Sequence, residues 1–171
     1  EFSFTADLSN NYRQDPSMGG GALLDVGPYQ LHLWSAMAAL GDLEITDVKQ
    51  SISATGVDLT TQVSAKIGRS LSVNAICSFE RPNQQVISIK GSGSEITFTA
   101  GEAFTNWHKP SALSVTTGGQ VTVEEFAPVD PYQLMVQAVS AQLNGEKAWL
   151  LPIEESLSVM QVIDQIRNVA K

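Results

Sequence analysis

A run of short apolar segments separated by turn residues constrains the fold more than any other feature. The segments that read as strands are Ile45–Ala54, Thr60–Ile67, Leu71–Phe79, Gln85–Lys90 and Ser94–Phe98. The connections between them hold Gly, Pro or Asn and span only a few residues. Parallel neighbours need a long crossover, so connections this short predict a mostly antiparallel sheet.

Helical patterns flank this β-rich region. Apolar residues recur at helical spacing over Ala22–Leu40, and Gly41 is expected to cap the end of that helix. Pro28 leaves two starting points open: the helix begins near Pro28, or it begins at the preceding glycines and kinks at the proline. Two further helices are expected over residues 132–143 and 153–170.

The order of the elements predicts an α+β fold. Strands are also expected at Glu1–Ala6, Ala112–Thr116 and Gln120–Phe126, the last two joined through Gly118-Gly119. One strand, one helix, many strands and two helices indicate a large, mostly antiparallel open β-sheet with helices packed on one face. Its other face reads as partly apolar and is expected to be an oligomer interface. Residues 1–171 are expected to form a single domain.

Composition argues against several classes of function. The formal net charge is −8, and the ten Lys and Arg residues are scattered, so neither nucleic acid nor an anionic membrane surface is an expected partner. The uncharged run Val26–Leu40 is too short and too polar to span a bilayer. Two His and one Cys give no set of metal ligands at sensible spacing, so no metal is expected. Cys77 is expected to be a buried small hydrophobe, and a cytoplasmic location is expected.

The segment with the most distinctive chemistry surrounds a run of three glycines. Arg13 precedes Gly19-Gly20-Gly21, which permit close approach of backbone or ligand at the start of a helix. Asp25 and Tyr29 follow at i, i+4 spacing and share one helix face if this turn is helical. Two interpretations stay open: an acid and a phenol in a cleft, or a turn-capping Asp25 and a core Tyr29.

The stretch Arg-x5-GGGALLDVGPY, from Arg13 to Tyr29, resembles the Gfo/Idh/MocA oxidoreductases. This family includes glucose–fructose oxidoreductase, inositol dehydrogenase and dihydrodiol dehydrogenase. The resemblance continues through Gly91-Ser92-Gly93-Ser94-Glu95-Ile96, Tyr132-Gln133 and Pro152-Ile153-Glu154-Glu155-Ser156, and so covers nearly the whole chain. The glycine–Asp–Tyr segment is fairly specific, and the other matches gain weight from their order.

The resemblance implies that the chain is only the C-terminal part of such an enzyme. The implied function is substrate binding and oligomerisation in an NAD(P)-dependent oxidoreductase acting on a sugar, polyol or related carbinol. Implied partners are the enzyme's own N-terminal Rossmann domain, a sugar-like substrate and further copies of the chain through the open sheet face. NAD or NADP is expected to bind mainly to that Rossmann domain, which is absent here, so the isolated domain is expected to be inactive.

Particular residues take their expected roles from the same resemblance. Asp25 and Tyr29 match the catalytic positions of the motif, where Tyr in place of His resembles the sugar-oxidoreductase and dihydrodiol dehydrogenase branch. The expected substrate-binding residues are Arg13, Gly20, Gly21, Trp107 and His108. Structural roles remain open alternatives: a loop-tethering arginine for Arg13, and a loop anchor for Trp107 and His108.

Two other classes of function remain open. In the first, the chain is a non-catalytic scaffold or ligand-binding module of the same fold. In the second, it is an α+β ligand-binding domain unrelated to the family. The sequence leaves undecided the substrate, the choice between NAD and NADP, the number of subunits and the presence of a catalytic lysine in the parent protein.

Overall fold

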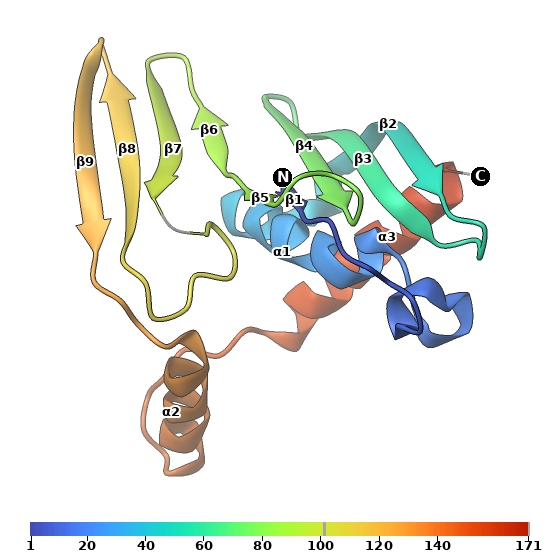
Figure 1. The fold of residues 1–171 in the computed structure, drawn as a ribbon. Coiled ribbons are helices and arrows are strands. Elements are labelled where there is room, and N and C mark those ends of the chain that lie inside the picture. Colours follow the sequence, from blue (N-terminus) through green and yellow to red (C-terminus); the bar gives the residue numbers. More distant parts are fainter. Residues whose placement is uncertain (101, 171) are drawn as a thin grey trace. The chain divides into compact units, whose positions relative to one another are not determined.

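The computed structural model describes residues 1–100 and 102–170, and the chain divides into two compact units (Figure 1). Unit 1 comprises Glu1–Gln84 and Pro152–Lys171, and unit 2 comprises Gln85–Leu151. The three α-helices of the described residues and their open sheets confirm the predicted α+β class. The strands form two hydrogen-bonded sheets where the sequence predicted one large sheet.

The first sheet, which belongs to unit 1 except for Gln85, has the strand order β2-β3-β4-β1-β5. Its strands are β1 (Phe2–Ser3), β2 (Leu43–Ile52), β3 (Asp58–Ile67), β4 (Leu71–Ser78) and β5 (Gln84–Gln85). The antiparallel pairing predicted from the short connections is confirmed for β2, β3 and β4. The first strand is much shorter than the predicted Glu1–Ala6, and it pairs in parallel with β4, with Phe2 opposite Cys77.

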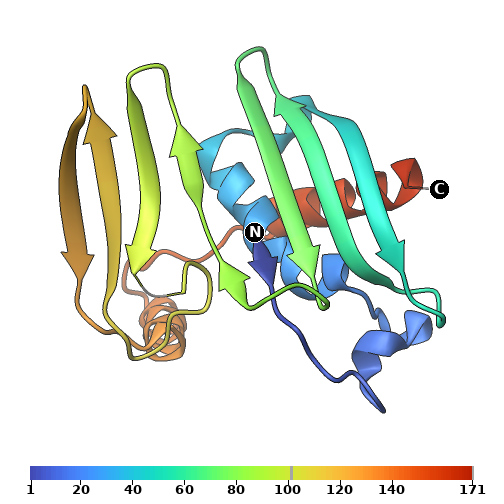
Figure 2. The same ribbon diagram turned by 45° about the horizontal axis from the view of Figure 1, so that its top comes forward.

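Two helices, α1 (Ala22–Met37) and α3 (Ile153–Val169), pack on one face of this sheet (Figure 2). The two helices and the sheet share one apolar core, because one face of β3 and β4 and one stripe of each helix carry the apolar side chains. The buried core positions include Leu23, Val26, Leu31, Trp34, Val63, Ala65, Val73, Ala75, Val159, Val162, Ile163 and Ile166. The opposite face of β3 and β4 is polar, with Gln62, Lys66 and Asn74 exposed, unlike the partly apolar face expected from the sequence.

Helix α1 settles the two open starting points. It begins at Ala22, directly after the glycines, and Pro28 lies inside it. The predicted end at Leu40 with a Gly41 cap is wrong. Ala38 leaves the helix in an extended conformation (φ −162°, ψ 152°), and Leu40–Asp42 form a separate 3-10 turn that buries Leu40.

A side-chain amide joins α1 to the sheet. The Gln30 amide accepts a hydrogen bond from the Ile76 backbone nitrogen and donates one to the Ile76 carbonyl, both at 3.0 Å. It also donates to the sulfur of Cys77 at 3.2 Å. The expectation of a buried Cys77 is confirmed, and burial raises the pKa of its thiol to about 12.

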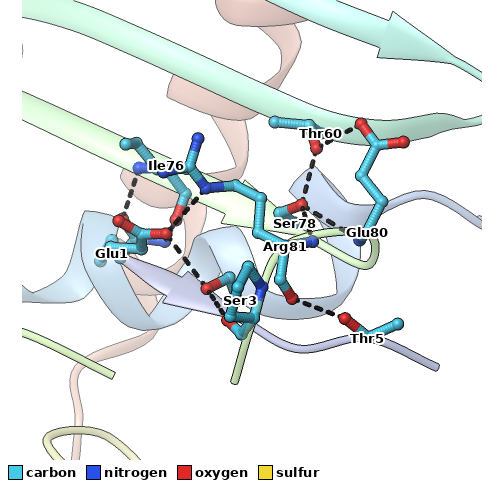
Figure 3. Close-up of polar contacts among 10 residues, drawn as sticks. Glu1, Ser3, Thr5, Thr60, Ile76, Ser78, Glu80 and Arg81 are labelled. Atoms are coloured by element: carbon cyan, nitrogen blue, oxygen red, sulfur yellow. Dashed lines mark hydrogen bonds and ion pairs between the residues drawn. The ribbon is translucent and has the colours of Figure 1, made fainter. Parts of the chain in front are cut away.

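A polar clasp holds β1 against the turn that follows β4 (Figure 3). The Ser3 hydroxyl donates to the Pro82 carbonyl at 2.8 Å, and the Thr5 hydroxyl donates to the Arg81 carbonyl at 2.9 Å. Arg81 Nε in turn contacts a carboxylate oxygen of Glu1 at 2.9 Å. These contacts fix a two-residue strand that has few ladder bonds of its own.

Unit 2 contains a four-stranded antiparallel sheet in the order β6-β7-β8-β9 and one helix, α2 (Pro131–Leu143). The strands are β6 (Ser88–Lys90), β7 (Ser94–Ala100), β8 (Ser111–Thr117) and β9 (Gln120–Phe126). The predicted strand Gln85–Lys90 is divided, because β5 ends at Gln85 and β6 begins at Ser88. The predicted hairpin between β8 and β9 is confirmed, with positive φ at both turn glycines.

One face of the unit 2 sheet is apolar over β6, β7 and β8, whereas β9 contributes Thr122 and Glu124 to it. The cross-strand register aligns Ile89, Ile96 and Val115, and the neighbouring pair Phe98 and Leu113 lies on the same face. Each of these side chains keeps part of its exposure. A partly apolar sheet face thus occurs in unit 2, and its role as an oligomer interface stays a prediction.

Candidate functional site

The predicted site residues Arg13 and Asp25 form an ion pair in unit 1. Asp25 lies in the first turn of α1, and its Oδ2 accepts a hydrogen bond from Arg13 Nε at 2.8 Å. Its Oδ1 accepts a second hydrogen bond from the Tyr12 hydroxyl at 3.1 Å. The carboxylate is mostly buried, at 14% side-chain exposure, so both donors compensate for its loss of water.

Tyr12 is a member of this cluster that sequence reasoning missed. It begins a 3-10 turn, Tyr12–Gln14, inside the segment expected to be a plain polar loop. The Arg13 guanidinium carbon lies 4.8 Å from the centroid of the Tyr12 ring, a cation–π distance. Hydrogen bonding to Asp25 raises the pKa of Tyr12 and that of Arg13, which keeps both as donors. Only the adjacency of an aromatic residue to Arg13 could have signalled this role.

Tyr29 lies one helical turn after Asp25 and is partly open to solvent. Its residue exposure is 42%, so the alternative of a core tyrosine does not describe it. The ring packs edge-on against Phe2 of β1, with centroids 5.3 Å apart. Because i and i+4 residues share a helix face, Asp25 and Tyr29 are presented together.

Gly20 and Gly21 make close backbone contacts within the chain. The Gly20 nitrogen donates to the Asp15 carbonyl at 2.9 Å, and the Gly21 nitrogen donates to the Arg13 carbonyl at 3.0 Å. A Cβ on Gly20 would lie 2.5 Å from that Arg13 carbonyl oxygen. The glycines thus fold the 3-10 turn tightly onto the start of α1, which places Arg13 beside Asp25.

Asp58 is a second residue that sequence reasoning missed. It begins β3, and its Oδ2 accepts a hydrogen bond from the Leu23 nitrogen at 2.8 Å, capping α1 from another element. The alternative that Asp25 caps this turn is therefore not what the structure shows. Burial raises the pKa of Asp58, opposed by its hydrogen bonds from Thr61 and Leu23. The cap joins residues 35 positions apart, so no local pattern could reveal it.

A cleft of about 460 Å³ opens beside this cap. It is lined by Pro16, Gly20, Leu23, Leu24, Gln50, Ile52, Gly56, Val57, Asp58, Asp164, Arg167 and Asn168. Asp25 and Tyr29 are not among the lining residues, although Leu23 and Leu24 of the same helix are. The α1 helix thus presents its predicted catalytic residues elsewhere on its surface.

Trp107 and His108 lie in unit 2, and their neighbours are at the start of α2. His108 Nε2 lies 3.3 Å from Asp130 Oδ2, and the Trp107 ring meets the Tyr132 ring edge-on at 6.2 Å. Asp130 also accepts hydrogen bonds from the Tyr132 and Gln133 nitrogens and so caps α2. These bonds, chiefly that from Gln133, lower the pKa of Asp130. The sequence predicted site roles for Trp107 and His108 but not for Asp130, and it named Tyr132 only as part of the family resemblance.

Three further observations concern metal ions, membrane spans and the glycine turn at Gly91 and Gly93. Among residues 1–100 and 102–170, no group of three or more His, Cys, Asp and Glu side chains is arranged to hold a metal ion. Within the same residues, no helix combines the length and apolar character needed to cross a bilayer. Gly91 and Gly93 form the turn between antiparallel β6 and β7, so they are not the strand–helix turn of a dinucleotide site.

Known structures share this fold. KijD10, a 3-ketoreductase from Actinomadura kijaniata crystallised with NADP and TDP-benzene, superimposes with a TM-score of 0.86 and 18% identity. That match covers 98% of this chain and 51% of KijD10. The dehydrogenase MviM from Clostridium difficile gives a TM-score of 0.62 at 15% identity, over 86% of this chain and 48% of MviM.

Sequence comparison points the same way. D-xylose 1-dehydrogenase (NADP(+)) 2 of Haloferax volcanii is 29% identical over 178 residues, which cover 99% of this chain and 52% of that protein. No protein-family model matches the chain. The chain matches the C-terminal half of Gfo/Idh/MocA-family oxidoreductases, which confirms the resemblance noted in the sequence. It spans about half the length of these relatives.

Proposed function

We propose that this chain is the substrate-binding and oligomerisation domain of an NAD(P)-dependent oxidoreductase that acts on a sugar or related polyol. The observation that carries the proposal is the similarity to the Haloferax xylose dehydrogenase along 99% of the chain. The placement of Asp25 and Tyr29 on one face of α1, with Arg13 against Asp25, supports it.

In this proposal Tyr29 handles the proton of the reacting hydroxyl group. Tyr29 is 42% exposed, so the proposal places part of its side chain within reach of a bound substrate. A phenol has a pKa of about 10, so it needs a neighbouring ammonium group to act as a base near neutral pH. A lysine of the N-terminal domain, as the family resemblance implies, would supply that charge.

Asp25 is proposed to orient the substrate through its carboxylate. Arg13 and Tyr12 occupy one lone-pair direction on each oxygen and hold the group in a fixed position. A carboxylate offers about four such directions, so each oxygen can accept a further bond from a sugar hydroxyl. Arg13 then acts through Asp25 by holding its carboxylate in place.

The glycine turn at Gly91 and Gly93 does not fit the phosphate-binding turn of a dinucleotide site. The turn at Gly91 and Gly93 leads into an antiparallel strand, and phosphate binding in dinucleotide sites needs a helix there. Hydride transfer belongs to the cofactor and the domain that binds it. This chain's proposed part is limited to holding the substrate and to proton transfer at Tyr29.

Oligomerisation is proposed to use the apolar face of the unit 2 sheet. Ile89, Ile96, Phe98, Leu113 and Val115 gather there, whereas the outer face of β3 and β4 carries Gln, Lys and Asn. Ile96→Lys should lower the mass measured by light scattering, while the matched change Asn74→Lys on β4 should not. An unchanged mass in Ile96→Lys would refute this face as the interface.

The test of the catalytic proposal is an oxidation assay on the complete gene product. We expect NAD(P)H to form with D-xylose or a related sugar, and Tyr29→Phe to lower kcat by roughly 100-fold or more, the range of general acid–base catalysis. Ser72→Ala, which removes an exposed hydroxyl on β4, is the matched control and should retain full activity. The isolated 171-residue chain should show no turnover.

Two results would overturn the proposal. Turnover by the isolated chain would show that no other domain is needed. A complete gene product that binds sugars but forms no reduced cofactor with any of them would instead support the non-catalytic binding module.

A further inference from the structure

We infer that Asp58 is a positioning residue that sets the start of α1, and with it the placement of Asp25 and Tyr29. This inference rests on the proposed function for its catalytic consequence, but its structural part stands on contacts within unit 1. The juxtaposition that carries it is a carboxylate on β3 against the glycine-led first turn of α1.

The first turn of α1 has no side-chain cap of its own. The residue at the capping position is Gly21, which makes no side-chain hydrogen bond. Ser, Thr, Asp or Asn normally fills that position and satisfies one of the free backbone N–H groups. Here Asp58 Oδ2 accepts the hydrogen bond from the Leu23 nitrogen at 2.8 Å.

The carboxylate is itself held by the sheet. The Thr61 hydroxyl donates to Asp58 Oδ2 at 2.6 Å, and the Gln50 amide on β2 donates to that hydroxyl at 2.8 Å. Thr61 is fully buried, so this relay is fixed in the core. These hydrogen bonds therefore anchor the start of α1 to two strands of the sheet, β2 and β3.

Gly21 is shaped to receive this carboxylate. A Cβ at Gly21 would lie 2.1 Å from Asp58 Oδ1, and the residue has φ +109°, which side chains rarely adopt. A local capping side chain is thus excluded at the one place where it would normally lie. The absence of a side chain at Gly21 leaves room for the Asp58 carboxylate, which then caps the helix in its place.

The same turn carries the proposed catalytic residues. The Gly21 carbonyl accepts the hydrogen bond from the Asp25 nitrogen at 3.2 Å, and the Gly21 nitrogen donates to the carbonyl of Arg13. A shift of the helix start would therefore move Asp25 relative to its Arg13 partner. Misplacement of catalytic groups by about 1 Å can cost roughly 100-fold in rate.

The first test compares Asp58→Ala, Asp58→Asn and the control Asp47→Asn in the complete gene product. Asp47 is on β2, and its side chain is 53% exposed. Asp58→Ala should lower kcat roughly 10- to 100-fold with the KM for cofactor unchanged. Asp58→Asn should recover most of that loss, since its amide oxygen still accepts from Leu23. Asp47→Asn should match the wild type.

The second test measures amide hydrogen exchange of the segment 21–27 in the same proteins. Asp58→Ala should speed exchange there, and Asp58→Asn and Asp47→Asn should not. Gly21→Ala should speed exchange of this segment less when it is combined with Asp58→Ala than when it is made in the wild type. The reason is that Asp58→Ala removes the clash between the new Cβ and Asp58 Oδ1.

The outcomes separate the two proposals. Wild-type activity with normal kcat in folded Asp58→Ala overturns the positioning role and leaves the proposed function intact. An inactive wild type overturns the proposed function, and the exchange data then decide alone whether Asp58 sets the helix start. Unchanged exchange in Asp58→Ala overturns the inference in either case.

Discussion

The two units of the chain differ in how far they bury their apolar side chains. In unit 1, α1 and α3 bury residues such as Leu31, Ile163 and Ile166 almost completely. In unit 2, α2 has no buried residue among its thirteen, and Leu143 is 83% exposed. A short helix is marginal in water without packing, so unit 1 is expected to hold itself together while α2 is expected to depend on further burial.

The two helix caps show the same difference. Asp58 caps α1 from a buried position, and loss of water raises its pKa. Asp130 caps α2 near the surface, and its backbone hydrogen bonds, Gln133 first, lower its pKa. The two capping carboxyl groups thus have pKa shifts in opposite directions, and the difference in burial accounts for this.

The largest expected effect separates the cores. Ile163→Ala should lower the free energy of unfolding by roughly 2–5 kcal/mol, because it leaves a cavity in a fully buried site. The matched change Leu143→Ala in α2 should alter it by less than about 0.5 kcal/mol. Urea denaturation measures both. A large loss in Leu143→Ala would mean that α2 is already packed.

A smaller effect is expected where α1 meets β4. Gln30→Leu should destabilise the protein by roughly 1–3 kcal/mol for each Ile76 backbone group left without a partner. Gln137→Leu on the exposed surface of α2 is the control and should be nearly neutral. Equal unfolding energies for the two variants would show that the Gln30 bridge adds nothing.

The smallest effects concern pH. Asp130, with a lowered pKa, stabilises the fold above the ordinary aspartate value of about 3.9, and this contribution is lost as pH falls through the lowered pKa. Asp58, with a raised pKa, contributes stability below about 3.9 that is lost as pH rises through the raised value. Carboxyl NMR titration should find Asp58 titrating above Asp130. The reverse order would contradict the burial argument.

The sequence predicts the local elements of this fold but few of its long-range tertiary contacts. Turn residues and apolar periodicity were enough for the antiparallel strands, the β8–β9 hairpin and the helices. The end of α1 was misplaced because Leu40 continues the apolar pattern while burying itself in a separate turn. Strand Gln85–Lys90 was read as continuous because nothing in its composition marks the change from one sheet to the other.

The candidate site was found by motif and completed by tertiary contacts. Asp25, Tyr29 and Arg13 follow from the glycine-led segment, but the ion pair between Arg13 and Asp25 requires the folded 3-10 turn. Asp58 carries no local signal, because its partner is 35 residues away along the chain. Tyr12 has only its adjacency to Arg13 as a signal, since its partner Asp25 is 13 residues away. Asp130 caps α2 through bonds two and three residues along the chain, whereas its contact with His108 spans 22 residues and requires the folded structure.

The proposal that this chain is one half of a dehydrogenase is tested most directly by the coding sequence upstream of Glu1. We predict an in-frame strand–Gly-x-Gly-x-x-Gly–helix unit with a Glu-Lys-Pro segment downstream of it. A start codon at the boundary, or an upstream domain lacking both features, would contradict the claim and return Asp25 and Tyr29 to structural roles.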